Sequence, residues 1–89
     1  MHAVVVRVTI SDAAGAQKEL RETVVPRVSS APGFVAGYWT RSADGGNGNS
    51  MIVFESEDAA KAAAERIGAN VSQGVTFDSA EVREVVASA

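Results

Sequence analysis

Hydrophobic residues follow a strand-like spacing in some segments of this chain and a helix-like spacing in others, and the order of these segments limits the possible folds. Residues 2–10 (HAVVVRVTI) are rich in β-branched side chains, which is typical of a strand. A stripe with helical spacing follows, then two strand-like segments, a second helical stripe and a last alternating segment. Because 89 residues are enough for only one domain, these six elements must share one core.

The first helical segment has clear start signals and one interruption. Its apolar stripe repeats every four residues, at Ala16, Leu20, Val24 and Val28. Ser11 and Asp12 precede the stripe and are good N-caps. Pro26 falls inside it, and proline lacks a backbone N–H and clashes with the preceding turn. We therefore expect a kink or an early end near Val24.

The second half of the chain has the same order of elements. Strand-like segments cover residues 34–42 and 50–55, and the turn-forming run ADGGNG joins them as a hairpin. Ser56 is a good N-cap for the second helix, and Gly68 fits its C′ position. The buried stripe of this helix is Ala59, Ala60, Ala63, Ala64 and Ile67. Residues 75–86 alternate loosely and predict a fourth, irregular strand.

Together these elements predict an α+β, ferredoxin-like βαββαβ fold, in which residues 1–89 form a single domain. Such a fold has a four-stranded antiparallel sheet with two helices on one face. Tyr38 and Trp39 are neighbours on the second strand, so their side chains point to opposite faces. The face without helices would carry Val5, one of Tyr38 and Trp39, and either Ile52 with Phe54 or Met51 with Val53. Because an apolar patch of that size rarely stays in water on a monomer, we expect a homodimer.

Composition excludes several classes of function. The chain has no cysteine, which excludes disulfides, thiolate metal sites and cysteine nucleophiles. A net charge of −3 with no basic run argues against nucleic acid as a partner. The apolar run at the N-terminus is far too short for a membrane span, so we expect no membrane partner and a soluble, cytoplasmic protein.

Three sequence features have a structural and a functional interpretation. The glycines of residues 43–48 lack the Lys and Ser/Thr of a phosphate loop and join two strands, which favours a hairpin tip. His2, the only histidine, is either a partly exposed strand-end residue or a group for proton transfer, and no second ligand supports a metal site. Arg7 stands in an apolar strand, so its guanidinium must face a partner, water or an anion, and an ion pair with a carboxylate is favoured over a ligand contact. Its candidate carboxylates are Glu55, Glu81 and Glu84.

The aromatic residues also allow two interpretations. Tyr38, Trp39 and Phe54 are either core residues or the walls on which a flat apolar ligand stacks. A Ser-His-Asp set cannot be assembled convincingly from one terminal histidine.

Two segments carry a resemblance to a known family. They are PGFVAGYWTRSADG (32–45), with a Pro-Gly-aromatic entry to the second strand, and FESEDAAKAA (54–63), with an aromatic-Glu-Ser-Glu junction. In these segments and in element order the chain resembles the antibiotic-biosynthesis-monooxygenase group of the dimeric α/β-barrel superfamily. That resemblance implies two sheets paired into a barrel, and a cavity between sheet and helices in each subunit. Some members oxidise polycyclic phenols with molecular oxygen and no cofactor, and others degrade haem.

The chain departs from both of these activities. Where phenol-oxidising members have an Asn and a Trp on the third strand, this sequence has Ser50 and Phe54. Where haem-degrading members have a His on the second helix and an Asn on the first strand, it has Ala64 or its neighbours and Arg7, so no proximal haem ligand is in place. We therefore expect no cofactor and no metal.

Two functions remain as hypotheses. The first is a protein like the cofactor-independent monooxygenases, acting on a small apolar or aromatic molecule. Arg7 would then hold an anionic group, Trp39, Ser50 and Phe54 would contact the substrate, and His2 or Tyr38 would move a proton. The alternative is a non-catalytic ligand-binding or stress-type barrel in which Arg7 is structural. RNA binding is disfavoured because the first strand has no exposed aromatic residue.

Overall fold

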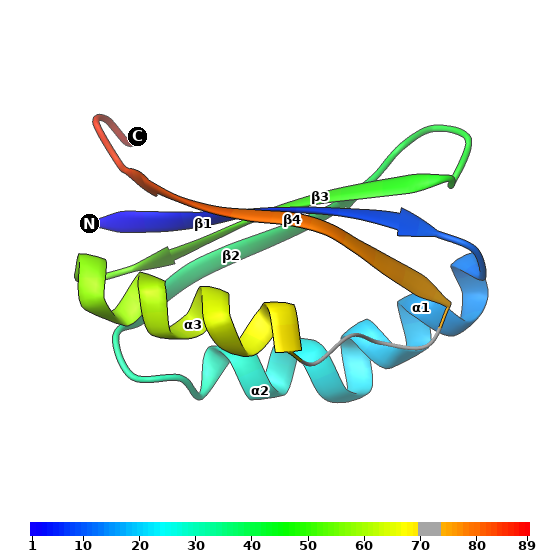
Figure 1. Ribbon diagram of the computed structural model, residues 1–89, viewed down its shortest axis with the longest axis horizontal. Coiled ribbons are helices and arrows are strands. Elements are labelled where there is room, and N and C mark those ends of the chain that lie inside the picture. The colour runs from blue at the N-terminus through cyan, green and yellow to red at the C-terminus, as the bar shows by residue number, and fades with distance from the viewer. Residues whose placement is uncertain (70–73) are drawn as a thin grey trace.

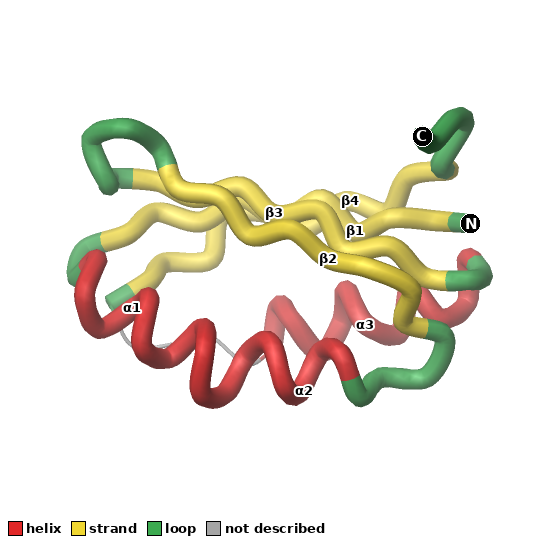
Figure 2. Tube along the Cα trace, turned by 180° about the vertical axis from the view of Figure 1, so that it is seen from behind, coloured by secondary structure: helices red, strands yellow, loops and turns green. Residues whose placement is uncertain are grey.

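A computed structural model describes residues 1–69 and 74–89 as one sheet with helices on one side of it. Its elements are β1 (His2–Ile10), α1 (Ala13–Glu19), the π-helical η1 (Leu20–Val24), α2 (Val25–Ser29), β2 (Phe34–Arg41), β3 (Asn47–Phe54), α3 (Glu57–Ala69) and β4 (Val75–Glu84). The strands form a four-stranded antiparallel sheet in the order β2-β3-β1-β4. Figures 1 and 2 show α1, α2 and α3 beneath the same face. The predicted α+β, ferredoxin-like arrangement is thus confirmed.

Most element boundaries agree with the pattern of the sequence to within two residues, as for β4, which ends at Glu84 where residue 86 was expected. The start of β3 and the expected cap at Gly68 differ. β3 begins at Asn47, three residues before the expected start, because pairing with β2 and β1 extends into the hairpin. α3 starts as expected, with the Ala59 N–H donating to Ser56 Oγ over 3.2 Å. The prediction that Gly68 is the C′ residue is wrong, since α3 continues to Ala69 and Gly68 does not have a positive φ.

The first helical segment is continuous but changes its hydrogen-bond register before Pro26. We call α1, η1 and α2 together the helical arm (residues 13–29). Its N-cap is Asp12, whose side chain accepts from the Gly15 N–H over 3.1 Å. The Val25 N–H donates to the Leu20 carbonyl, five residues back, just before the proline that has no N–H to donate. The expected early end near Val24 is therefore wrong, because the helix continues through a π segment as far as Ser29.

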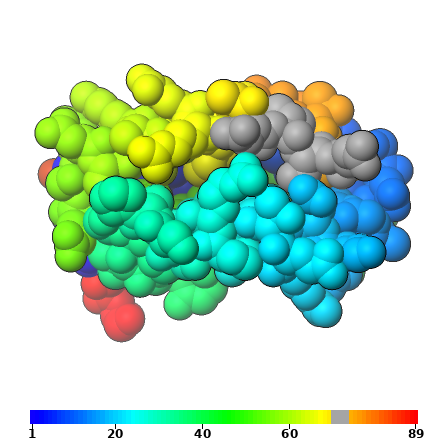
Figure 3. All heavy atoms as spheres, turned by 90° about the horizontal axis from the view of Figure 1, so that it is seen from below, coloured from blue at the N-terminus to red at the C-terminus, as the bar shows by residue number. Residues whose placement is uncertain are grey.

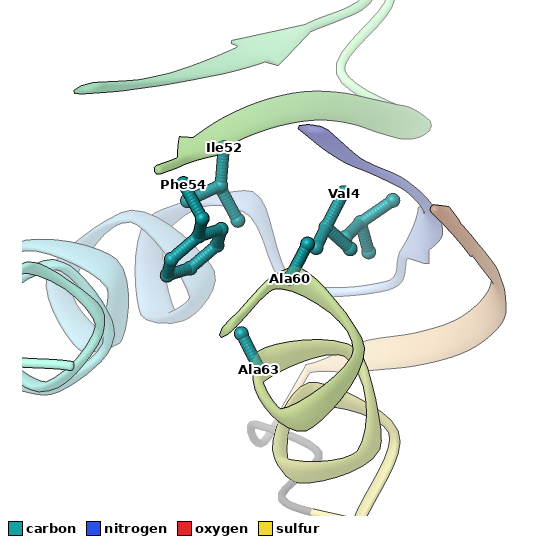
Figure 4. Packing of buried hydrophobic residues seen from close by; sticks show 6 residues of the cluster. Val4, Ile52, Phe54, Ala60 and Ala63 are labelled. Atoms are coloured by element: carbon teal, nitrogen blue, oxygen red, sulfur yellow. The ribbon is translucent and has the colours of Figure 1, made fainter. Parts of the chain in front are cut away.

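The core lies between α3 and the middle of the sheet. Val4, Ile52 and Phe54 are fully buried and face Ala60 and Ala63 of α3, as Figure 4 shows. The ring of Phe34 meets Phe54 edge-on, with centroids 6.2 Å apart and an interplanar angle of 80°. In contrast, no residue of the helical arm is buried. The helical arm and α3 therefore pack very differently against the sheet.

The register of β2 decides which of its two large aromatic residues faces the helices. Tyr38 pairs with Met51, and Met51 pairs with Val5, so these three form a row across the face that has no helices. We call this the outer face. Tyr38 and Met51 are exposed there, at 71% and 49%. Trp39 pairs with Ser50 on the other face, beneath the helical arm.

Among the residues that the structure describes, no helix is long and apolar enough to span a lipid bilayer.

Candidate functional site

A cavity of about 430 Å³ lies between the helical arm and the sheet. In the view from the helix side, the surface is hollowed between the cyan arm and the yellow α3 (Figure 3). The wall on the arm carries the predicted stripe Ala16, Leu20, Val24 and Val28. The opposite wall is the helix-facing side of the sheet, including Val6, Val8, Ile10, Trp39, Ile52 and Phe77. Ala63 and Ile67 of α3 close one side. The volume falls in the range of small-molecule sites, roughly 300–1,000 Å³.

The cavity exists because the arm turns an apolar face to the sheet without filling the space beneath it. At its N-terminal end the facing positions are Ala13 and Ala16, each of which presents only a methyl group to the cavity. Leu20 and Val24 come from η1, where the wider register replaces a regular turn. All four residues of the stripe line the cavity, and none is buried.

Trp39 supplies the aromatic wall, and Gly37 determines how its ring lies. The two residues are on the same face of β2, and the indole folds back over the glycine. A Cβ at position 37 would lie 2.8 Å from Cη2 and 2.9 Å from Cζ3 of Trp39. Because no real Cβ contact is that short, only glycine permits this placement of the ring. Trp39 is half-buried and packs on the edge of the core.

The polar residues of the cavity include no carboxylate; the uncharged ones are Gln17, Thr40, Asn49 and Ser50. Ser50 lies on the wall beside Trp39, and its hydroxyl makes no hydrogen bond to any described residue. The charged residues of the lining are Arg27 of α2, Arg41 of β2 and Arg66 of α3. No His, Asp, Glu, Lys or Tyr of the described chain lines the cavity. Its walls thus offer apolar surface, hydrogen-bond donors and positive charge, and no side chain that titrates near neutral pH.

Two of the six site residues expected from the sequence line this cavity: Trp39 and Ser50. Phe54 does not line it, because its ring is fully buried in the core beside Phe34. Arg7 lies exposed on the outer face, where it pairs with Asn49 and Ser79 in the sheet.

The alternative expectation for Arg7, an ion pair with a glutamate, also differs from the structure. Arg7 makes no ion pair with any described residue, and Glu81 is bridged to Arg83 at 2.8 Å. Its position on the outer face leaves the guanidinium in water, so the charge needs no protein partner.

The two expected proton-transfer groups lie away from the cavity. Tyr38 is on the outer face. His2 is at the end of β1, where its Nε2 lies 3.7 Å from Glu57 Oε2 and its Nδ1 is buried without a hydrogen-bond partner in the described chain. With a side chain 22% exposed, His2 has the surroundings of the partly exposed strand-end residue that was one of its two interpretations.

The glycine-rich turn is a hairpin tip, as its context indicated. Gly45 has a positive φ of 76°, and the Asp44 Oδ1 accepts from the Gly46 N–H over 2.8 Å and from the Ser42 hydroxyl over 2.7 Å. These bonds, that of Gly46 above all, lower the pKa of Asp44. The turn therefore holds a carboxylate of its own, where a phosphate loop would present free amides.

The sequence matches no protein-family model and none of the curated proteins. Within the part of the chain that the structure describes, no three of His, Cys, Asp and Glu gather closely enough to hold a metal ion.

Proposed function

We propose that this chain binds a small apolar or aromatic molecule in the cavity between the helical arm and the sheet. The observation that carries the proposal is an open apolar space of about 430 Å³ with Trp39 on its wall. An aromatic face and a few separate polar groups are typical of sites that orient a mainly apolar ligand. Binding would also cover the apolar face of the arm, which packs poorly in the chain alone.

Binding without turnover is the better supported of the two hypotheses. A cofactor-independent oxygenation needs a group that takes a proton from the substrate and a donor for the developing oxyanion. Ser50 and the arginines of the lining could serve as donors, but His2 and Tyr38, the expected proton carriers, lie outside the cavity. Oxygen uptake with a polycyclic phenol above the protein-free rate would reverse this choice.

The only tryptophan of the chain gives a direct test of binding, because it forms part of the wall. N-phenylnaphthylamine is neutral, and its fluorescence rises in apolar surroundings. We expect it to bind with saturation at one molecule per chain and to quench Trp39 emission by energy transfer. Ala16→Leu, which extends into the cavity, should weaken this signal, whereas Ala14→Leu on the exposed side of α1 should not. Weak, unsaturable binding to both variants alike would contradict the proposal.

We further propose that the outer face pairs with a second copy of the chain. Tyr38, Met51 and Val5 form an apolar row there, which no helix covers. Charges of both signs, on Arg7, Glu81 and Arg83, lie beside the row, so a second copy could offer opposite charges in a two-fold pairing. This arrangement would place the sheets face to face, as in the dimeric α/β barrels that the sequence resembles.

Sedimentation measures this pairing directly. At micromolar concentration we expect about 18 kDa, twice the 9.2 kDa of the chain. Tyr38→Lys should give a folded monomer, because pairing would then bury a charged side chain in the apolar row. Ala62→Lys, on the exposed side of α3, is the matched control and should remain dimeric. A folded wild-type monomer under these conditions would rule out the pairing.

A further inference from the structure

The charged residues around the cavity are all of one sign. Of eight basic residues in the chain, three line the cavity, and of eleven acidic residues none does. The protein as a whole carries a net charge of −3, so the cavity differs in sign from its surroundings. A local excess of positive charge next to apolar walls attracts anions and disfavours cations.

These arginines come from three separate elements. Arg27 is on α2, Arg41 is the last residue of β2, and Arg66 is in the last turn of α3. Arg27 and Arg41 make no ion pair or side-chain hydrogen bond to any described residue, so their donors are available to a ligand. Guanidinium groups bind carboxylates and similar anions through paired N–H donors.

We infer that the ligand is an amphiphilic anion: an apolar aliphatic or aromatic body that lies in the cavity and one carboxylate-like group that is attracted by all three arginines and held by one of them. The inference rests on the proposed function and adds the chemical class of the ligand. It also moves the anion-binding role from Arg7, where the sequence suggested it, to arginines on the other face of the sheet. The apolar body supplies burial, and the charge fixes the orientation.

Decanoate, decanol and decylamine test the charge preference, because they share one tail and differ only in the head group. Each is titrated against bound N-phenylnaphthylamine. We expect decanoate to displace the probe at the lowest concentration and decylamine at the highest. Because the arginines are exposed to solvent, the difference between the displacing concentrations of decanoate and decanol should become smaller as the salt concentration is raised. Equal displacement by decanoate and decanol would overturn the inference.

Charge-removing variants connect the preference to these side chains. One variant replaces all three arginines: Arg27→Gln, Arg41→Gln, Arg66→Gln. Its affinity for decanoate should be about 10–100-fold lower than that of the wild type, and its affinity for decanol should be unchanged. The matched control is Lys18→Gln, Arg21→Gln, Lys61→Gln, which removes the same charge from exposed helical positions outside the cavity. This control should bind decanoate and decanol with the affinities of the wild type. An equal loss of decanoate affinity in both triple variants would show that only net charge matters and would overturn the inference.

A single variant keeps the test decisive if the triple variant does not fold. Arg27 is exposed and without a partner in the described chain, so Arg27→Gln should fold normally and weaken decanoate by about 3–10-fold. No loss in this variant and in Arg41→Gln would refute the assignment. The neutral probe separates the two levels of the proposal. If N-phenylnaphthylamine fails to bind the wild type, the proposed function itself fails; if it binds without any preference for decanoate, only the present inference fails.

Discussion

Replacing Ala16 by leucine tests whether the cavity is open space in the folded chain. Ala16 is half-buried on α1 and faces the cavity. Leucine adds three carbon atoms there, and each buried CH₂ is worth about 0.8 kcal/mol, so the upper limit is about 2.4 kcal/mol. Fixing the leucine rotamer costs about 0.5–1 kcal/mol, and helix propensity is nearly the same for the two residues. The expected net gain in the free energy of unfolding is therefore about 1–2 kcal/mol.

The measurement is equilibrium urea unfolding of protein that has been refolded from denaturant, so that any bound molecule is removed first. Thermal unfolding is a second measurement: for a domain of this size, the melting temperature should rise by about 4–8 °C for each kcal/mol of added stability. Ala14→Leu is the matched control, since it makes the same change two residues away on the exposed side of the helix. It should change the free energy of unfolding by less than about 0.5 kcal/mol.

The sign of the Ala16→Leu effect distinguishes the two possibilities. If other side chains already fill the space, the added carbons force them aside, and the variant should be less stable by about 1–3 kcal/mol. A destabilised Ala16→Leu beside a neutral Ala14→Leu would therefore refute the cavity and, with it, the proposed function.

Three further outcomes follow from other contacts. Gly37→Ala should shift the emission of Trp39 and cost about 1–3 kcal/mol, because the new methyl group would lie 2.8 Å from the indole; an unchanged spectrum would contradict this. In urea unfolding, Phe54→Ala should cost about 3–5 kcal/mol and Trp39→Ala less, because Phe54 is fully buried and Trp39 partly faces the cavity; the reverse order would contradict the assignment of core and wall. The Asp44 pKa, lowered by its bonds from Gly46 and Ser42, should rise toward 3.8 in Ser42→Ala, as a carboxyl NMR titration can show; its contribution to stability should be complete above pH 3.8 and lost as the pH falls through the lowered pKa.

The fold could be predicted because its signals are local. The alternation in β1, the N-caps Asp12 and Ser56 and the hairpin tip each depend on a few neighbouring residues. The failure at Gly68 has the same cause: a glycine after an apolar stripe is typical of a helix end, but the backbone there remains helical for one more residue.

The site was less predictable because it depends on strand register and on distant parts of the chain. Neighbouring positions show that Tyr38 and Trp39 face opposite ways, but only the pairing of β2 with β3 shows which of them faces the helices. Periodicity likewise cannot bring together Arg27, Arg41 and Arg66, which come from three elements and stand in no repeating pattern. Arg7 attracted attention because it interrupts an apolar strand, yet a charged residue on an exposed face of a sheet needs no ligand.

The stripe on the helical arm shows why the same pattern can produce either a core or a cavity. Its spacing determines which face of a helix turns toward the sheet, and that inference was correct for all four residues. Whether the face packs depends on side-chain volume, which spacing does not encode. α3 presents Ala60 and Ala63 to Val4, Ile52 and Phe54, and these large residues of the sheet fill the gap. The arm also begins with alanines, but opposite it β3 carries Gly48 and Ser50. These small side chains leave space open at the positions they occupy, although larger residues such as Val8, Trp39 and Phe77 line the rest of the wall. The ligand proposed here would occupy the volume that large core residues occupy beneath α3.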